Sequence, residues 1–362
     1  MIRRRLIRRR LCAILFVSAL AAHVEATEQT SAGLGESDAQ TSAGAEKSDE
    51  PSPFALGFLA FGDFYAVPSN HLPEADGDIG AWIRRVYLTF DYTWSPRLFT
   101  RLRFEANQDG DFVNHGFTVD FKDVYLQWSV GRQNILVGLV PSPTFDIQDR
   151  IWGYRHLEKT PLDLQGVPSR DNGIAANGPI NQSGRLRYRA MFGSGANFGK
   201  ETGEGEKFMG AVTWGGERGW LFDVYGDFQE LPDATDRTSL QVFSVYRGGD
   251  GRLGLQYFYQ DREDDPRLEL ASAYGVVDLS PTVTFVGRID RLMTPSIKGN
   301  DIDYLPFDPN AKATLFIAGV EFRLHRYVSL MPNVEFIIYD EPDSVEKPKN
   351  DFFIRLTFYF HS

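Results

Sequence analysis

The chain has 362 residues, of which 42% are hydrophobic and 14% aromatic, and its formal net charge is −11. This length allows one large domain or two ordinary ones. Basic residues are not clustered with aromatic residues, which argues against nucleic acid as a partner. The single cysteine, Cys12, lies near the N-terminus, so the rest of the chain can have neither a disulfide framework nor a thiolate metal site.

The N-terminal region predicts export. Arginine triplets at 3–5 and 8–10 precede an apolar run at 11–22, and a small residue, Ala26, follows shortly after. This order is typical of a secretory signal peptide, which we assign to residues 1–26. Residues 27–53 are mainly Ser, Thr, Gly, Ala and acidic residues, so we expect a disordered tether there. The folded domain is predicted to span 54–362.

From Phe54 onward, apolar residues recur at every second position, which is the period of a β-strand. Val86 and Leu88, for example, are followed by the polar Thr89 and Asp91 at the opposite parity. We predict sixteen strands, at 54–66, 80–93, 98–107, 118–128, 134–140, 171–178, 184–193, 207–214, 219–228, 238–247, 252–260, 268–278, 282–291, 313–324, 327–339 and 351–360.

Tight turns and longer loops alternate along the chain. Short links such as 94–97 and 215–218 are separated by long connections such as 67–79, 141–170 and 292–312. Outer-membrane barrels show this rhythm because their periplasmic turns are short and their outer loops are long. A soluble β-sandwich also has alternating strands, but it does not predict the rhythm. We therefore predict an all-β fold, a transmembrane antiparallel β-barrel of about 16 strands in the bacterial outer membrane.

The last predicted strand has one entirely apolar face. Residues 352, 354, 356, 358 and 360 are Phe, Ile or Leu, whereas Arg355, Thr357 and Tyr359 lie between them. We expect the apolar face to contact lipid and the other face to line the lumen, with this strand pairing to the first so that no backbone group is left open in hydrocarbon. A closing strand rich in aromatics is also similar to the signal that the barrel-assembly machinery recognises.

Basic residues fall on the polar parity of several strands. Arg85, Arg101 and Arg103 do so on the second and third strands, and Arg187 and Arg189 on the seventh. Because neighbouring strands lie about 4.8 Å apart, the first three could form a ladder. Such ladders make anion pathways. The alternative is that each arginine pairs with a carboxylate of the barrel wall, such as Asp91 or Glu105.

The third long loop, residues 141–170, contains aromatic residues and charges of both signs and is too long for a plain connection. We expect it to fold into the barrel and narrow it; a surface loop or a subunit-contact loop is the alternative. The expected constriction residues are the bases Arg150, Arg155, Lys159 and Arg170 and the counter-charges Asp146, Asp149 and Glu158.

Motifs for chemistry are weak. The six histidines are scattered without metal-binding spacing, and Gly193-Ser194-Gly195 does not continue into a dinucleotide-binding loop. We expect no catalytic residues, no metal, no cofactor and no enzymatic reaction.

The first half of the predicted barrel resembles the phosphate-selective, OprO/OprP-like porins of the Gram-negative outer membrane. The similar stretches are RRVYL at 84–88, FEAN at 104–107, FKDVYLQW at 121–128, VGLVPSP at 137–143 and SRDNG at 169–173. The resemblance implies a homotrimeric 16-stranded porin with an inward third loop and a basic track for anions. It adds Lys122 and Arg170 to the candidate path residues.

The expected function is passive diffusion of small hydrophilic solutes, with a mild preference for anions, phosphate among them. The expected partners are outer-membrane lipid, further copies of the chain, small anions or other hydrophilic solutes, and the barrel-assembly machinery. Two alternatives stay open, a plugged barrel with a structural or adhesive role and an outer-membrane barrel enzyme. Ion conductance distinguishes the porin from both.

Overall fold

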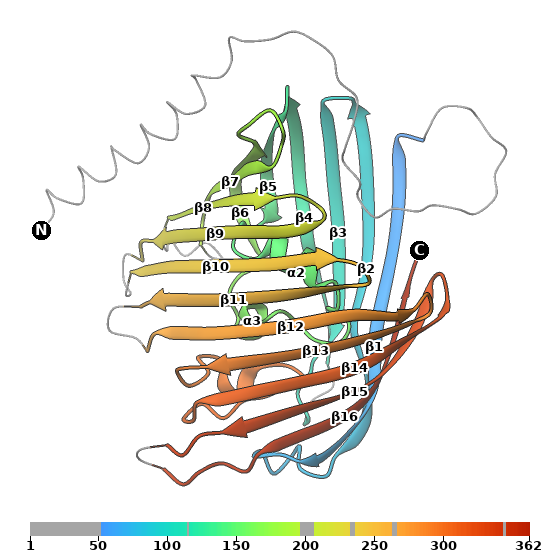
Figure 1. The fold of residues 1–362 in the computed structure, drawn as a ribbon, viewed down its shortest axis with the longest axis vertical. Coiled ribbons are helices and arrows are strands. Elements are labelled where there is room, and N and C mark those ends of the chain that lie inside the picture. The colour runs from blue at the N-terminus through green and yellow to red at the C-terminus, as the bar shows by residue number, and fades with distance from the viewer. Residues whose placement is uncertain (1–51, 114–115, 196–205, 232–235, 263–265, 343–344) are drawn as a thin grey trace, which may run out of the picture. The chain divides into compact units, whose positions relative to one another are not determined.

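The computed structural model describes residues 52–113, 116–195, 206–231, 236–262, 266–342 and 345–362. The predicted signal peptide and nearly all of the predicted tether lie outside the described residues. In the described part, sixteen antiparallel strands form one closed barrel, in which each strand pairs with its neighbours in sequence and β1 pairs with β16 (Figure 1).

The strands are β1 (Phe54–Ser69), β2 (Ile79–Ser95), β3 (Leu98–Gln108), β4 (Phe117–Val130), β5 (Gln133–Pro141), β6 (Arg170–Pro179), β7 (Leu186–Gly193), β8 (Lys207–Gly215), β9 (Gly219–Gln229), β10 (Arg237–Gly248), β11 (Gly251–Asp261), β12 (Leu268–Ser280), β13 (Val283–Leu292), β14 (Ala313–His325), β15 (Val328–Tyr339) and β16 (Asp351–His361). Every predicted segment is a strand, and the fold class is confirmed. Period-two patterning is sufficient here because each strand separates lipid from the barrel interior.

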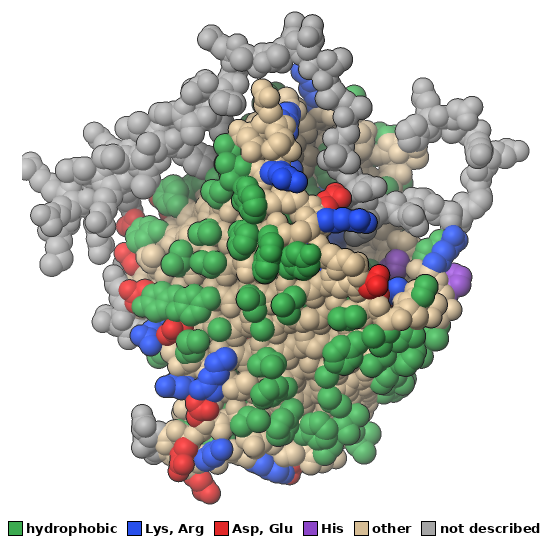
Figure 2. Space-filling view, viewed as in Figure 1, with side chains coloured by type: hydrophobic (Ala, Val, Ile, Leu, Met, Phe, Trp, Pro, Cys, Tyr) green, Lys and Arg blue, Asp and Glu red, His purple; other side chains and the backbone are tan. Residues whose placement is uncertain are grey.

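The outside of the barrel is apolar, as Figure 2 shows for one side of it. On β16, Ile354 and Leu356 are 45% and 39% exposed, whereas Arg355 and Thr357 between them are 2% and 0% exposed. The closing strand therefore has the predicted orientation. Backbone pairing around the closed sheet and an apolar outer belt are the two requirements of a membrane-spanning barrel. No helix among the described residues is long and apolar enough to cross a membrane.

Two irregularities in strand pairing change which side chains face inward. The register of β1 with β2 shifts between Phe61 and Gly62, and both Arg84 and Arg85 are buried. The register of β3 with β4 shifts between Arg103 and Phe104, opposite the buried neighbours Lys122 and Asp123. A β-bulge inserts one extra residue and re-aims side chains, so simple alternation fails at these two places.

The β5–β6 loop folds into the barrel, as predicted for the third loop. It contains the short helices α2 (Asp146–Trp152) and α3 (Pro161–Leu164), and Trp152 and Leu157 are almost completely buried. The β13–β14 loop, with the 3-10 turn η1 (Gly299–Asp301), also turns inward and buries Leu305 and Phe307. The sequence predicted a long loop there, but not its inward course.

An apolar cluster fills one side of the barrel interior. It joins Trp152 and Leu157 of the β5–β6 loop, Leu305 of the β13–β14 loop, and inward side chains of the wall such as Phe243 and Val286. Burial of this much apolar surface holds both loops in place. One small pocket lies beside α3, β12 and β13, and another, lined by cations, lies beside β1 and β2.

Candidate pore constriction

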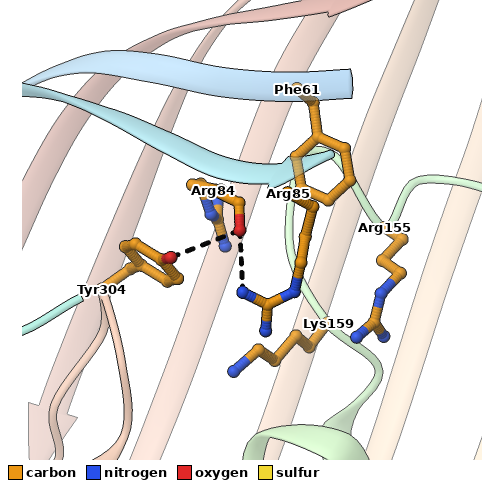
Figure 3. A pocket seen from close by; sticks show the side chains of 6 residues that line it. All are labelled: Phe61, Arg84, Arg85, Arg155, Lys159 and Tyr304. Carbon is orange, nitrogen blue, oxygen red and sulfur yellow. Dashed lines mark hydrogen bonds between the residues drawn. The ribbon is translucent and has the colours of Figure 1, made fainter. Parts of the chain in front are cut away.

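A basic cleft lies between the wall and the two inward loops (Figure 3). The space between its lining atoms, part of which is open to solvent, is about 180 Å³. Four of its six lining side chains are cations, and they come from β2 and the β5–β6 loop. The lining residues are Phe61, Arg84, Arg85, Arg155, Lys159 and Tyr304.

Arg84 belongs to a buried ionic cluster that ties the β5–β6 loop to the closing strands; we call it the latch. Its guanidinium contacts Asp63 of β1 at 3.3 Å and Glu158 of the loop at 2.7 Å. Arg355 of β16 contacts Asp63 at 3.4 Å, Glu158 at 3.8 Å and Glu335 of β15 at 3.1 Å. All five side chains are at most 2% exposed.

The composition of the latch is unequal, with three carboxylates and two guanidinium groups. Buried charges are stable only when paired and hydrogen-bonded. The two arginines provide the pairing by bridging two or more carboxylates each, but the oxygens of Glu335 accept no hydrogen bond within the described part of the chain. Arg84 also donates to the carbonyl oxygen of Leu157 at 3.0 Å. The guanidinium group of Arg84 is therefore fully engaged in structural contacts, although the side chain lines the cleft.

Arg85, the next residue, faces the open side of the cleft. It donates to the carbonyl oxygen of Arg84 at 2.7 Å and lies 3.3 Å from the carboxylate of Glu105 on β3. Lys122 of β4 contacts the same carboxylate at 3.0 Å. The ring of Tyr304 lies 6.0 Å below the Arg85 guanidinium, within the range of a cation–π contact.

Three further ion pairs, centred on two carboxylates, continue along the wall. Arg101 makes a bidentate contact with Asp91, with both hydrogen bonds at 2.8 Å. Arg103 of β3 and Arg170 of β6 both contact Asp123, the former at 3.2 Å. Because two cations share one carboxylate, this part of the wall keeps one surplus positive charge.

The loop side of the cleft supplies two cations. Arg155 contacts Asp163, and it also lies 3.7 Å from Asp149. Lys159 lies 3.7 Å from the partly exposed Asp303 of the β13–β14 loop. Burial, together with the nearby charge of Arg85, lowers the pKa of Lys159 to about 8. Lys159 is therefore mainly protonated near neutral pH, but it loses its proton more readily than an ordinary lysine.

The other predicted site residues lie away from the cleft, where α2 meets β7. Arg189 contacts Asp146 at 2.9 Å and Asp223 of β9 at 3.1 Å. Arg150, whose side chain is 70% exposed, approaches Asp146 at 3.6 Å. Arg187 is exposed and makes no ion pair among the described residues. The structure therefore brings only part of the predicted set together.

For the strand arginines near the cleft, both interpretations made from the sequence hold in part. Arg85, Arg101 and Arg103 lie on the inner wall, as a basic track requires, and each is paired with a carboxylate, as the alternative requires. The sequence missed Arg84, because alternation places only one of two adjacent arginines inward. It also missed Tyr304.

The β5–β6 loop crosses the lumen and contacts the wall around most of its circumference. Gln241 of β10 donates to the carbonyl oxygen of Thr144, and Arg288 of β13 donates to that of Lys159 at 2.7 Å. His156 stacks on Tyr359 of β16 with ring centroids 4.4 Å apart. The loop is therefore fixed to β10, β13 and β16 inside the barrel.

No family model and no curated protein matches the chain. Solved structures do match it. An anion-selective porin from Comamonas acidovorans is 13% identical with a TM-score of 0.61, and the match covers 85% of this chain and 99% of that one. Salmonella typhi OmpF in complex with daunomycin is 10% identical with a TM-score of 0.61, over 85% and 97%.

OmpT of Vibrio cholerae, folded in vitro and described in a trimer form, is 12% identical with a TM-score of 0.56, over 85% of this chain and 99% of that one. At these identities the likeness concerns the fold. The chain has the fold of bacterial outer-membrane porins.

Proposed function

We propose that this protein is an outer-membrane porin through which small hydrophilic solutes diffuse passively, with a mild preference for anions. The observation that carries the proposal is the basic cleft between the wall and the β5–β6 loop, with Arg85, Arg155 and Lys159 on its lining. Closely placed cations in a low-dielectric constriction raise the local concentration of anions and repel cations. No reaction is part of the proposal.

The preference is mild because most cations of the wall are paired. Arg101 and Asp91 cancel, whereas Arg103 and Arg170 share Asp123 and leave one charge over. Lys159 and Asp303 are only loosely joined at 3.7 Å. Inorganic phosphate is one anion worth testing, since guanidinium groups bind its oxygen atoms well and the sequence resembles phosphate-selective porins.

We further propose that the barrel assembles as a homotrimer in the outer membrane. Support comes from the resemblance seen in the sequence and from the described trimer form of a protein with the same fold. The closing strand β16, with its apolar lipid-facing side, is the segment proposed to contact the barrel-assembly machinery.

The test is single-channel conductance of the refolded protein in a planar bilayer under a KCl gradient. We expect small conductance steps in groups of three. The reversal potential should be shifted toward the equilibrium potential of chloride. The variant Arg155→Gln should lower the anion preference, whereas Arg218→Gln, an exposed arginine of the β8–β9 turn, should leave it unchanged. Cation-selective steps would overturn the anion preference but keep the pore.

A second candidate function is a plugged barrel with a structural or adhesive role. The apolar cluster formed by both inward loops with the wall favours it, because it closes a large part of the lumen. Absence of steps from a folded, heat-modifiable barrel would support the plugged barrel and reject the porin.

A further inference from the structure

The β13–β14 loop, residues 293–312, covers the basic cleft. Its Tyr304 lines the cleft, and the carbonyl oxygen of Tyr304 accepts a hydrogen bond from Arg355. The neighbouring Asp303 faces Lys159 at 3.7 Å. A shift of this loop would therefore remove one side of the cleft and one counter-charge together. We call residues 293–312 the lid.

The lid is held at Tyr304 in a strained conformation. Tyr304 has a φ of 67°, and it is the one non-glycine residue with a positive φ in the described part of the chain. That conformation costs an ordinary side chain of order 1 kcal/mol or more. It is maintained by contacts of its ring with Trp82, at 5.5 Å between centroids, and with the Arg84 guanidinium at 5.0 Å. The carbonyl oxygen of Gly110 accepts a hydrogen bond from the Tyr304 N–H at 3.0 Å, and that of Gln108 accepts one from the Tyr304 hydroxyl group. The strain therefore lowers the net stability of a lid that stays anchored at Tyr304.

A histidine fastens the outer part of the lid to the rim of the barrel. His71, in the β1–β2 loop, places Nδ1 2.8 Å from an Asp351 carboxylate oxygen on β16 and Nε2 3.0 Å from the Asn300 side-chain oxygen on the lid. Its backbone N–H donates to the other Asp351 oxygen at 2.7 Å. We call this junction of three segments the clasp.

Both ring nitrogens of His71 thus face oxygen atoms. A neutral imidazole has one N–H and can donate to only one of them, whereas the imidazolium ion donates to both. The proton therefore decides how strongly the lid and the rim are joined through this ring. A neutral ring held by Asp351 no longer donates to the Asn300 oxygen, and it keeps a contact there only when the Asn300 side chain turns to donate its amide N–H to Nε2.

The groups facing His71 come from every segment around it. They are Asp351 of β16, Tyr339 of β15, and Asn300 and Asp308 of the lid. Burial opposes the charged ring, but the hydrogen bond and the charge of Asp351 outweigh burial, so the pKa of His71 is raised above 6.5. Below the ordinary imidazole pKa, His71 is protonated and donates to both Asp351 and Asn300. The contribution of this charged form to the clasp is lost as the pH rises through the raised pKa of His71.

We propose that the β13–β14 loop is a pH-dependent lid over the basic cleft, which protonated His71 clasps to the rim and which loosens when that proton leaves. The released proton goes to solvent. The effect on flux rests on the proposed porin function, whereas the movement of the lid does not.

Hydrogen exchange tests the lid independently of conduction. Amide exchange of residues 293–312 would be measured at about pH 6 and about pH 8.5, relative to the rate of an unprotected peptide at each pH. We expect protection of the lid to fall by about ten-fold at the higher pH in the natural protein. His71→Gln should show the low protection at both values.

Conductance is the second measurement. It should rise by about two-fold or more between the same two pH values in the natural protein and not in His71→Gln. Because Lys159 also titrates near pH 8, the difference between the two proteins is decisive. Asn300→Leu, which removes only the lid side of the clasp, gives a second variant in case His71→Gln does not fold. His325→Gln, at the exposed end of β14, is the control.

The outcomes separate the two proposals. Lid protection that depends on pH without any conductance would keep the lid and reject the porin. Conductance with lid protection that is independent of pH, or that still changes in His71→Gln, would overturn the lid. Loss of the pH effect in both clasp variants but not in the control supports it.

Discussion

Replacing Arg355 by methionine should strongly destabilise the barrel. Arg355 joins Asp63, Glu158 and Glu335 in the latch, at 3.4, 3.8 and 3.1 Å. Methionine preserves much of the side-chain volume but leaves three buried carboxylates with one guanidinium, that of Arg84. Glu335 would then have no base within ion-pair distance among the described residues.

The size of the effect follows from the geometry. At an effective dielectric constant of about 20, two unit charges 3.1 Å apart attract by about 5 kcal/mol. Desolvation offsets much of this in the intact pair, but removing one partner leaves the other buried charge uncompensated, which costs about 3–5 kcal/mol. We expect a loss of that size for Arg355→Met.

Guanidinium unfolding of the refolded barrel in lipid vesicles, followed by tryptophan fluorescence, measures the change. Trp152 lies in the β5–β6 loop and is 1% exposed, so the signal includes the interior. The control is Arg218→Met, in the exposed β8–β9 turn. A loss of unfolding free energy below about 1 kcal/mol for Arg355→Met would refute the reasoning, because that is the contribution of a solvent-exposed salt bridge.

Four further predictions follow from the same side chains. Glu158→Gln should cost less stability than Arg355→Met, because the latch then has equal charges, yet chemical unfolding should show a loosened β5–β6 loop as earlier exposure of Trp152. Glu105→Gln removes a negative charge beside the cleft and should increase the chloride preference measured from reversal potentials. That preference should fall as the pH rises through about 8, where Lys159 loses its proton. Leu356→Arg on the lipid-facing side of β16 should cost about 2–4 kcal/mol in vesicle unfolding.

The strands could be predicted from the sequence because one face of each strand contacts lipid and the other faces the barrel interior. On β16, each change from Ile354 to Arg355 to Leu356 crosses from lipid to interior, and a one-residue slip would place the arginine in hydrocarbon. The pairing of β1 with β16 follows from closure of the sheet, which the absence of water in the hydrocarbon enforces. Little else is needed to predict this barrel.

Bulges mark the limit of that reasoning. Arg84 and Arg85 are adjacent in sequence, and strict alternation turns one of them toward lipid, which is too costly for a charge near the membrane centre. The pair RR within a strand was therefore a readable signal of a bulge. Lys122 and Asp123 present the same signal on β4.

The pairing of charges across the interior could not be read, since it depends on which strands lie opposite each loop residue. Glu158 was predicted as a counter-charge of the constriction, but its partners Arg84 and Arg355 come from β2 and β16. The inward course of the lid was partly readable. Tyr304, Leu305 and Phe307 are apolar or aromatic residues in an otherwise polar loop, and all three are buried.

The latch and the clasp hold the two inward loops in different ways: the latch holds the β5–β6 loop and the clasp holds the lid. The latch is enclosed and has no exposed charge, and it ties the β5–β6 loop to the wall through Arg84 and Arg355. The clasp joins the lid through one titratable ring at the rim, which is largely buried and contacts the exposed Asn300. Of the two loops that define the basic cleft, one is therefore a fixed wall and the other can respond to pH. A variant that weakens the latch should change stability at every pH, whereas one that weakens the clasp should change only the pH dependence of the lid.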